Sequence, residues 1–163
     1  MKTTHIVAIV LAVIVAGAVA GISLMNKGDN NGSNIDKTEF GTITMFKSPN
    51  CGCCGIYSQY LNRKDFSVGI VSTPDADLAN LKNKDGIPAQ LRSCHTMNVG
   101  NYFVEGHIPA EAIEKLMTEK PDIKGIAMPG MPSGSPGMPG GKTGDFVIYA
   151  VNNDGSFQEF MRV

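Results

Sequence analysis

The sequence has no block of like charge and no concentration of basic residues. Its 14 Lys and Arg residues and 15 Asp and Glu residues are interspersed, and the formal net charge is −1. A nucleic-acid-binding surface needs a patch or stripe of positive charge, which this chain lacks. We therefore expect no nucleic-acid partner.

Charge is absent altogether from residues 6–25, a run of apolar or small residues preceded by Lys2. A run of this length can span a bilayer as a helix. Ala18-Val19-Ala20 also offers a small-x-small cleavage pattern. We expect residues 1–25 to be a signal anchor or a signal peptide, and a buried core helix is the weaker alternative. The rest of the chain is then periplasmic or otherwise extracytoplasmic, held to the membrane by residues 6–25 if they are not cleaved.

Apolar residues are scarce in residues 26–41, which are rich in Asn, Gly and Asp. This composition is typical of a flexible linker. The folded domain is expected to cover residues 42–163. Its length of about 120 residues is sufficient for one modest core.

Hydrophobic periodicity and turn residues predict a β-α-β-α-β-β-α order within the domain. Strands are expected at 42–48, 66–72, 87–97 and 101–108, and helices at 55–65, 73–86 and 109–120. Thr73 is expected to cap the second helix. A Gly/Pro/Met loop over 125–144 and a C-terminal β-hairpin over 145–163 are expected to follow.

Cysteine is scarce, yet Cys51, Cys53 and Cys54 lie within four positions, between the first predicted strand and the first predicted helix. A helix N-terminus stabilises thiolate through its unpaired N–H groups and its dipole. Because thiolate both attacks disulfides and binds soft metals, this position leaves redox exchange and metal binding open. A dithiol exchanger needs only two cysteines, whereas a soft metal ion benefits from a third thiolate. The cluster therefore favours metal binding.

The remaining cysteine, Cys94, stands next to His95. These two side chains point to opposite faces of a regular strand, so they can share a metal only where the strand ends or bends. His107 is a further candidate ligand, although hydrogen bonding is the more common role of a lone histidine. The alternative to a metal site is structural, because four cysteines outside the cytoplasm can form two disulfides.

The sequence repeats Met-Pro three times in the Gly/Pro/Met loop, at Met128, Met131 and Met138. Proline and glycine exclude a regular helix, so these methionines do not form one apolar helical stripe. The thioether is a soft ligand suited to Cu(I), and it cannot be lost to disulfides in an oxidising compartment. As an alternative, Met128 and Met131 anchor the loop on the core as adaptable apolar side chains.

The element order resembles that of the thioredoxin superfamily, which places C-x-x-C at the start of its first helix and a cis-proline before its third strand. Cys51 to Cys54 fits the first feature, and Pro88 is placed to fit the second. Four motifs in order, KSPNCGCCGIY, GIPAQLRSCHT, YFVEGHIPAEAI and PGMPSGSPGM, resemble the bacterial CopG-type copper-resistance family, domain of unknown function 411. This resemblance implies a thioredoxin-like α/β fold, export and copper-linked metal binding. The family commonly has Trp where this chain has Tyr57.

Together these features predict an extracytoplasmic protein that binds Cu(I) for copper resistance or delivery, with Ag(I) and zinc as alternative metals. Its partners are then the metal ion and other copper-handling proteins. The candidate ligands are Cys51, Cys53, Cys54, Cys94, His95, His107, Met128, Met131 and Met138. We expect binding rather than catalysis. The competing interpretation is a thiol-disulfide oxidoreductase that uses Cys51 and Cys54, and a third is a disulfide-stapled interaction domain.

Overall fold

The structure is a computed structural model, and it describes residues 37–163. This part of the chain contains one mixed seven-stranded sheet, three α-helices and two short 3-10 helices. The predicted anchor or signal segment and residues 26–36 of the predicted linker lie outside the described residues. None of the helices within 37–163 has the length and apolar character needed to cross a membrane.

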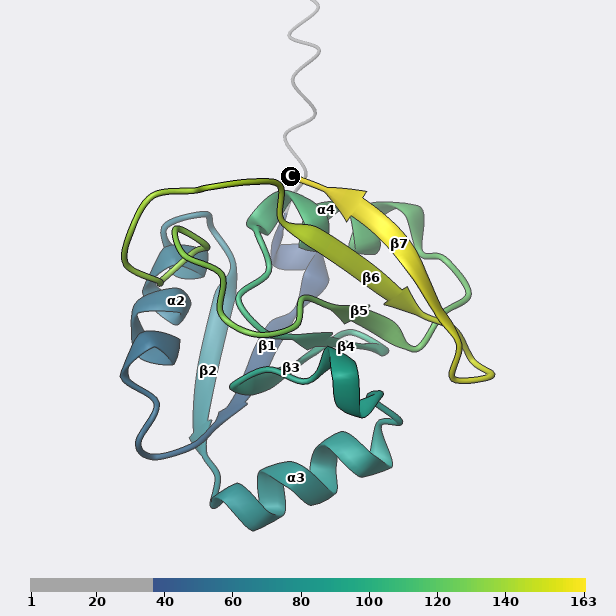
Figure 1. The fold of residues 1–163 in the computed structure, drawn as a ribbon, viewed down its shortest axis with the longest axis horizontal. Coiled ribbons are helices and arrows are strands. Elements are labelled where there is room, and N and C mark those ends of the chain that lie inside the picture. The colour runs from purple at the N-terminus through teal and green to yellow at the C-terminus, as the bar shows by residue number, and fades with distance from the viewer. Residues whose placement is uncertain (1–36) are drawn as a thin grey trace, which may run out of the picture. The chain divides into compact units, whose positions relative to one another are not determined.

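The strands and α-helices as far as α4 follow the order that the sequence predicts (Figure 1). The elements are η1 (Lys37–Phe40), β1 (Thr42–Lys47), α2 (Gly52–Asn62), β2 (Ser67–Ser72), α3 (Asp75–Lys84), η2 (Ala89–Leu91), β3 (His95–Val99), β4 (Tyr102–Glu105), α4 (Ala110–Glu119), β5 (Gly125–Ala127), β6 (Val147–Val151) and β7 (Phe157–Arg162).

The strand order across the sheet is β2-β1-β3-β4-β5-β6-β7. β1 pairs in parallel with β2 and antiparallel with β3, and β4 continues the antiparallel pairing. The register sets Lys47, the last residue of β1, opposite His95, the first residue of β3. This pairing brings the chain that enters β3 beside the chain that leaves β1 for α2. Two segments far apart in the sequence therefore meet at one end of the sheet.

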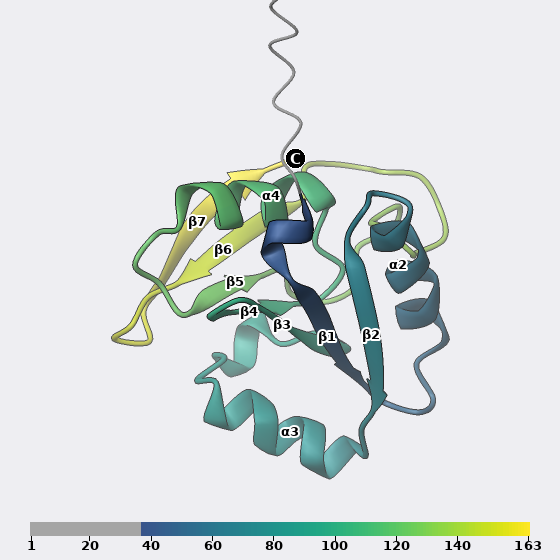
Figure 2. The same cartoon turned by 180° about the vertical axis from the view of Figure 1, so that it is seen from behind.

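The two faces of the sheet carry separate apolar clusters. Residues of α2 and α4 pack on one face, where Tyr57 and Leu116 lie against strand residues such as Met97. Ile87 and Leu91, from the segment containing η2, pack with other apolar residues in the second cluster. Figure 2 shows α3 set apart from α2 and α4. Successive strand residues point to opposite faces of the sheet. The apolar residues along β3 and β4 therefore determine which face of each strand is turned to the core.

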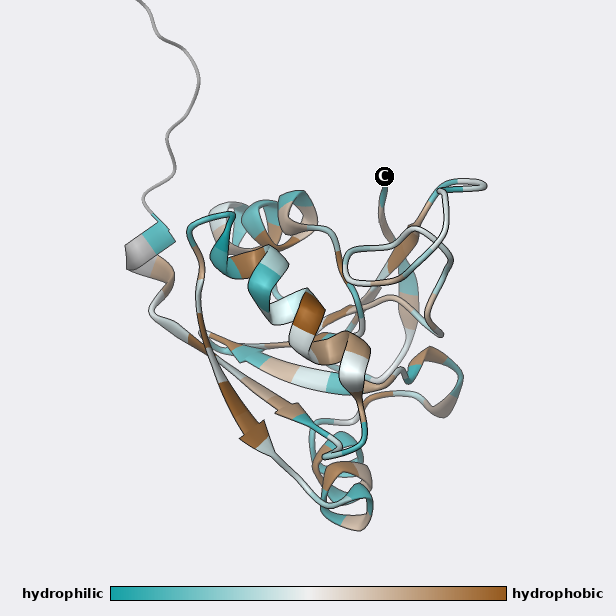
Figure 3. Ribbon diagram, turned by 90° about the vertical axis from the view of Figure 1, so that its left-hand side faces the viewer, coloured by the Kyte–Doolittle hydropathy of each residue, from teal (hydrophilic) through white to brown (hydrophobic). Residues whose placement is uncertain are grey.

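One edge of the sheet is β2, an uncharged strand whose side chains are largely exposed. Ile70 and Val71 are 48% and 42% exposed, and the arrowhead end of the strand is brown, the colour of apolar residues, in Figure 3. Parallel pairing with β1 satisfies the backbone hydrogen-bonding groups on only one side of this strand. Among the described residues, no other strand pairs with its outer side.

The segment between α3 and β3 differs from the prediction. Residues 87–97 were predicted as a strand, but they contain η2, and β3 begins only at His95. Within residues 37–163 no peptide bond is cis, so Pro88 has a trans bond rather than the cis bond of the thioredoxin pattern. At the start of α3 the capping residue is Pro74 rather than Thr73, and no side chain caps this helix.

Two further segments are more ordered than the sequence indicates. The strand β5 (Gly125–Ala127) occupies the beginning of the predicted Gly/Pro/Met loop and pairs in parallel with β4. Lys37–Phe40, assigned to the linker from the sequence, form the 3-10 helix η1. Phe40 packs on Phe66 with ring centroids 6.1 Å apart. In both cases tertiary packing orders a segment of weak local propensity.

Candidate metal and redox centre

The cysteine cluster lies where β1 turns into α2. The Cys51 N–H donates to the Ser48 carbonyl at 3.1 Å, which closes the turn. Cys51 is the N-cap residue of α2, and its side chain makes no capping hydrogen bond. In the first turn of the helix Cys54 points into the core and is fully buried, whereas Cys53 is partly exposed. Helical spacing therefore separates an inner thiol from an outer one.

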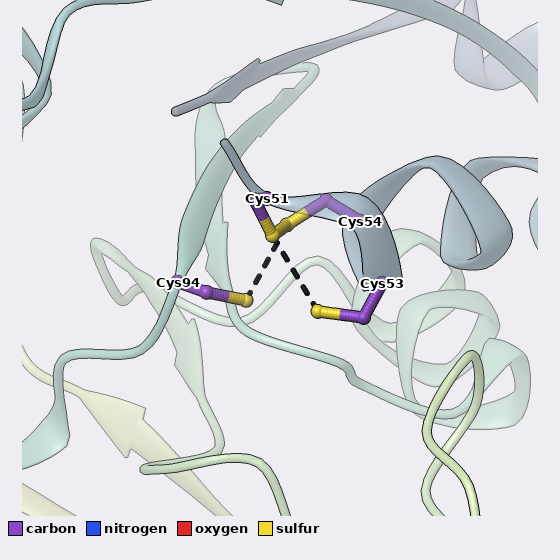
Figure 4. A group of neighbouring side chains, drawn as sticks. All are labelled: Cys51, Cys53, Cys54 and Cys94. Atoms are coloured by element: carbon purple, nitrogen blue, oxygen red, sulfur yellow. Dashed lines mark hydrogen bonds between the residues drawn. A yellow bond between two sulfur atoms is a disulfide. The ribbon is translucent and has the colours of Figure 1, made fainter. Parts of the chain in front are cut away.

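Cys51 and Cys54 form a disulfide, and Cys53 and Cys94 are free thiols. This connectivity differs from the two bridges of the structural alternative. Cys53 Sγ lies 3.5 Å from Cys51 Sγ, and Cys94 Sγ lies 3.5 Å from Cys54 Sγ. In Figure 4 dashed lines run from the disulfide to both free thiols. All four sulfur atoms lie within 4.8 Å of one another.

Two imidazoles adjoin the sulfur atoms. Cys94 Sγ is 3.3 Å from His95 Nδ1 and 3.1 Å from His107 Nε2. Cys94 and His95 share one site because Cys94 precedes the first residue of β3, where strand alternation does not yet apply. The start of β3 is thus the strand end at which these two residues can share a metal. Cys54, Cys94, His95 and His107 form a second group with donor atoms within 4.8 Å, so the two groups share Cys54 and Cys94.

The tautomer of His107 follows from its contacts. Its Nδ1 lies 2.7 Å from the Pro136 carbonyl, which can only accept, so Nδ1 carries the hydrogen. In a neutral imidazole Nε2 is then unprotonated, and this lone pair faces Cys94. His95 Nε2 is buried without a hydrogen-bond partner among the described residues.

Burial governs the charge states of these groups. It lowers the pKa of His95 well below its ordinary value, and the neighbouring His107 lowers that pKa further. Burial also lowers the pKa of His107, opposed by the hydrogen bond to the Pro136 carbonyl. Burial and the neighbouring Cys53 raise the pKa of the Cys94 thiol to about 11. At neutral pH the centre thus holds neutral imidazoles, the form that binds metals, and a thiol that loses its proton when metal binds.

Sequence reasoning assigned Tyr57 to the core and missed its contact with both histidines. Its ring centroid is 4.9 Å from that of His95 and 5.0 Å from that of His107. Its hydroxyl donates to the Ile108 carbonyl at 2.8 Å. Tyr57 therefore restricts the orientations of both imidazoles.

A buried ion pair between Lys82 of α3 and Glu105 of β4, also missed from the sequence, holds the segment before Cys94. Lys82 Nζ donates to the Ser93 carbonyl at 2.8 Å, and the Ser93 N–H donates to Glu105 Oε1 at 2.6 Å. Glu105 Oε2 also accepts from the Thr96 hydroxyl at 2.6 Å. Both backbone polar groups of Ser93 are thus fixed. The signal in the sequence was Lys82, four positions after Leu78 on the only buried stripe of α3.

A pocket of about 500 Å³ opens over the sulfur cluster. Cys51, Cys53 and Cys94 line it together with Met131 and residues of α3. The centre is therefore accessible from solvent on the side of its thiols, while its imidazoles are buried.

Two solved structures, described as "Copper resistance protein copG", Form 1 and Form 2, share this fold. They are 34% and 35% identical to this chain, with TM-scores of 0.68 and 0.67. Each match covers 75% of this chain and 96% or 97% of the other. A family described as "Protein of unknown function, DUF411" matches residues 91–138. The chain belongs to the CopG-type DUF411 family. No curated protein matches it.

In this CopG-type chain the three loop methionines occupy different environments. Met131 is 48% exposed, and its Sδ lies 3.9 Å from Cys53 Sγ. Met128 follows β5 and is buried in the core cluster, as the apolar alternative describes for this residue. Met138 is partly buried, and its N–H donates to the Ser135 carbonyl. Of the three, the structure brings Met131 to the thiols.

In this CopG-type chain the ring of Tyr57 packs against both imidazoles. Tyr57 is fully buried. The Gly/Pro/Met loop reaches the same place, because the Pro136 carbonyl accepts from His107. The four family motifs therefore converge on one centre.

Proposed function

We propose that this protein binds Cu(I) outside the cytoplasm and serves copper resistance or copper delivery. The observation that carries the proposal is the convergence of four sulfur and two imidazole donors in two groups that share Cys54 and Cys94. Thiolate and thioether are the ligand types that favour Cu(I), and they also accept Ag(I). Zinc is the alternative for the Cys/His group.

Metal binding through the whole cluster requires reduction of the Cys51–Cys54 disulfide by an external dithiol, which supplies two electrons and leaves two thiols. Cys51, Cys53 and Cys54 are then the main ligands, with Cys94. His95 and His107 complete or orient the site. The pocket over Cys53 and Met131 supports entry and exit of the metal on this side.

The proposed fold is a variant of the thioredoxin fold. Strand order β2-β1-β3-β4, with one parallel and two antiparallel pairs, supports it, and so does the cysteine motif at the start of α2. The trans bond at Pro88 is a departure from the pattern. The extracytoplasmic location, with residues 6–25 as anchor or export signal, is supported by the sequence alone.

The test is an anaerobic Cu(I) titration of the reduced full-length protein against a competing chelator, with X-ray absorption to identify the bound atoms. We expect sulfur-dominated coordination that a Cys51/Cys53/Cys54→Ser variant loses. His107→Gln is expected to lower the nitrogen content, and His5→Gln is the matched control. Affinity no greater than that of the chelator contradicts copper binding as the function.

The second candidate is a thiol-disulfide oxidoreductase, favoured by the Cys51–Cys54 disulfide at the N-terminus of α2. This activity predicts that the reduced protein transfers electrons to a disulfide substrate faster than a free thiol does. Loss of that transfer in Cys51→Ser, with the transfer retained in Cys53→Ser, which keeps the Cys51–Cys54 pair, identifies redox exchange at this disulfide as a separate activity.

A further inference from the structure

Each sulfur of the Cys51–Cys54 disulfide has its own free thiol neighbour. Cys53 lies beside Cys51 and Cys94 beside Cys54, both at 3.5 Å between sulfur atoms (Figure 4). Disulfide exchange begins with attack of a thiolate on one sulfur of the bond. Either free thiol is therefore placed to rearrange the disulfide within the protein.

The surroundings of the two thiols distinguish them. Cys94 Sγ lies 3.1 Å from the unprotonated Nε2 of His107, whose Nδ1 is held by the Pro136 carbonyl. A thiol, a base and a group that orients the base are the parts of an activated nucleophile. Cys53 instead faces the thioether of Met131 at 3.9 Å, which is no proton acceptor of comparable strength.

We propose that Cys94 is an internal resolving thiol, which attacks Cys54 with His107 as proton acceptor and moves the disulfide from Cys51–Cys54 to Cys54–Cys94. One S–S bond forms as another breaks. The thiol proton passes to His107 Nε2 in concert with the attack, because burial raises the pKa of Cys94 and lowers that of His107. The electron pair of the broken bond leaves on Cys51 Sγ as thiolate. The step is redox-neutral and needs no external oxidant or reductant.

The exchange relocates the reactive sulfur. Cys51 is the N-cap of α2, lines the pocket and makes no side-chain capping bond in the disulfide form. A thiolate released there can accept hydrogen bonds from the free N–H groups of the first helical turn, and the helix dipole stabilises it. Attack by Cys94 beside the buried histidines thus delivers a thiolate to the helix end. This inference goes beyond metal binding and does not depend on it.

The Cys53→Ser variant of the full-length chain tests the exchange, because it retains one disulfide and one free thiol. The oxidised, chelator-treated variant is held in excess N-ethylmaleimide, quenched with acid, digested with trypsin and mapped by mass spectrometry. Cleavage after Lys47, Arg63, Arg92 and Lys115 separates peptide 48–63 from peptide 93–115. We expect the label mostly on Cys51, and the two peptides joined through Cys54 and Cys94. Label mostly on Cys94, with the disulfide inside peptide 48–63, overturns the proposal.

The role of His107 is tested in the same Cys53→Ser background. His107→Gln is expected to slow the appearance of the joined peptides about a hundredfold, and the control His5→Gln leaves the rate unchanged. An unchanged rate in His107→Gln refutes the role of His107.

A Cys51/Cys53→Ser variant tests independently whether the sulfur atoms of Cys54 and Cys94 can bond, since only these two cysteines remain. It is expected to form the joined peptides quantitatively on mild oxidation without metal. Two persistent free thiols contradict the sulfur geometry on which the exchange depends. Because no metal is present in these experiments, their failure leaves the Cu(I) titration unaffected.

Discussion

Single residues of one type play different parts in this protein, and the methionines show it most clearly. Met128 is 1% exposed and packs in the core, whereas Met131 is 48% exposed and adjoins Cys53. A Met→Leu substitution keeps size and apolar character but removes the soft sulfur. The same substitution at the two positions therefore separates ligation from packing.

Met131→Leu is expected to weaken Cu(I) binding by about tenfold, the lower end of the range for groups that support a metal site. The matched variant Met128→Leu should retain the affinity and change the free energy of unfolding by less than about 1.5 kcal/mol. Chelator competition measures the first quantity and urea unfolding the second. Equal loss of affinity in both variants would assign the methionines a packing role only.

At the scale of elements, α3 has two buried residues, Leu78 and Lys82. Lys82→Met leaves the Glu105 carboxylate buried without its cation, at an expected cost of about 3–5 kcal/mol. The double variant Lys82→Met/Glu105→Gln removes both charges and keeps an acceptor for the Ser93 N–H, so it should be more stable than Lys82→Met alone. Urea unfolding of the wild type, Lys82→Met, Glu105→Gln and the double variant measures the coupling between the two residues. Strictly additive effects would show that the pair is not coupled.

The Gly/Pro/Met loop packs closely against the backbone of α2 at Gly137. Gly137 has φ +82°, and a Cβ there would lie 2.8 Å from the Tyr57 backbone nitrogen. Gly137→Ala is expected to cost about 1–3 kcal/mol and to displace the adjacent Pro136 carbonyl from His107. The control Gly141→Ala adds a Cβ in open space. Thermal unfolding and the NMR shifts of the His107 ring provide the readouts, and equal behaviour of the two variants would contradict the attachment.

At the scale of the whole molecule, the sequence predicts what depends on local pattern. Hydrophobic periodicity and turn residues located β1, α2, β2 and α4. Ligand chemistry identified all six Cys and His residues that converge, because few residue types bind soft metals. The order of strands and α-helices as far as α4 and the Cys and His residues that lie together were therefore predictable without coordinates.

Features that depend on distant packing were not predictable in this way. β5 is only three residues long and exists because β4 and β6 flank it. The Lys82–Glu105 pair joins residues 23 positions apart, and the Pro136 carbonyl reaches His107 across 29. Neither contact has a local signature. The isomer of the peptide bond before Pro88 likewise depends on tertiary contacts, which the local sequence does not specify.

The same burial that assembles the centre gives the whole molecule a pH dependence. Burial lowers the pKa of His95 and His107 below the value of about 6.5 expected in the unfolded chain. Below that pH the unfolded chain takes up protons that the folded protein excludes, so stability is lost as the pH falls. Each histidine contributes a slope of at most about 1.4 kcal/mol per pH unit. Glu105 and Asp85, whose pKa burial raises, act in the opposite direction.

The contribution of the histidines is therefore measured as a difference. Urea unfolding of the metal-free protein at pH 7.5 and pH 5.5 is compared with that of the His95→Gln/His107→Gln variant, which retains both acids. The wild type should lose more stability than the variant on acidification, because only the wild type carries imidazoles that are neutral when folded and protonated when unfolded. Parallel loss in the two proteins would mean that the imidazoles keep ordinary pKa values in the folded state. That result would contradict the burial of His95 and His107 beside Cys94.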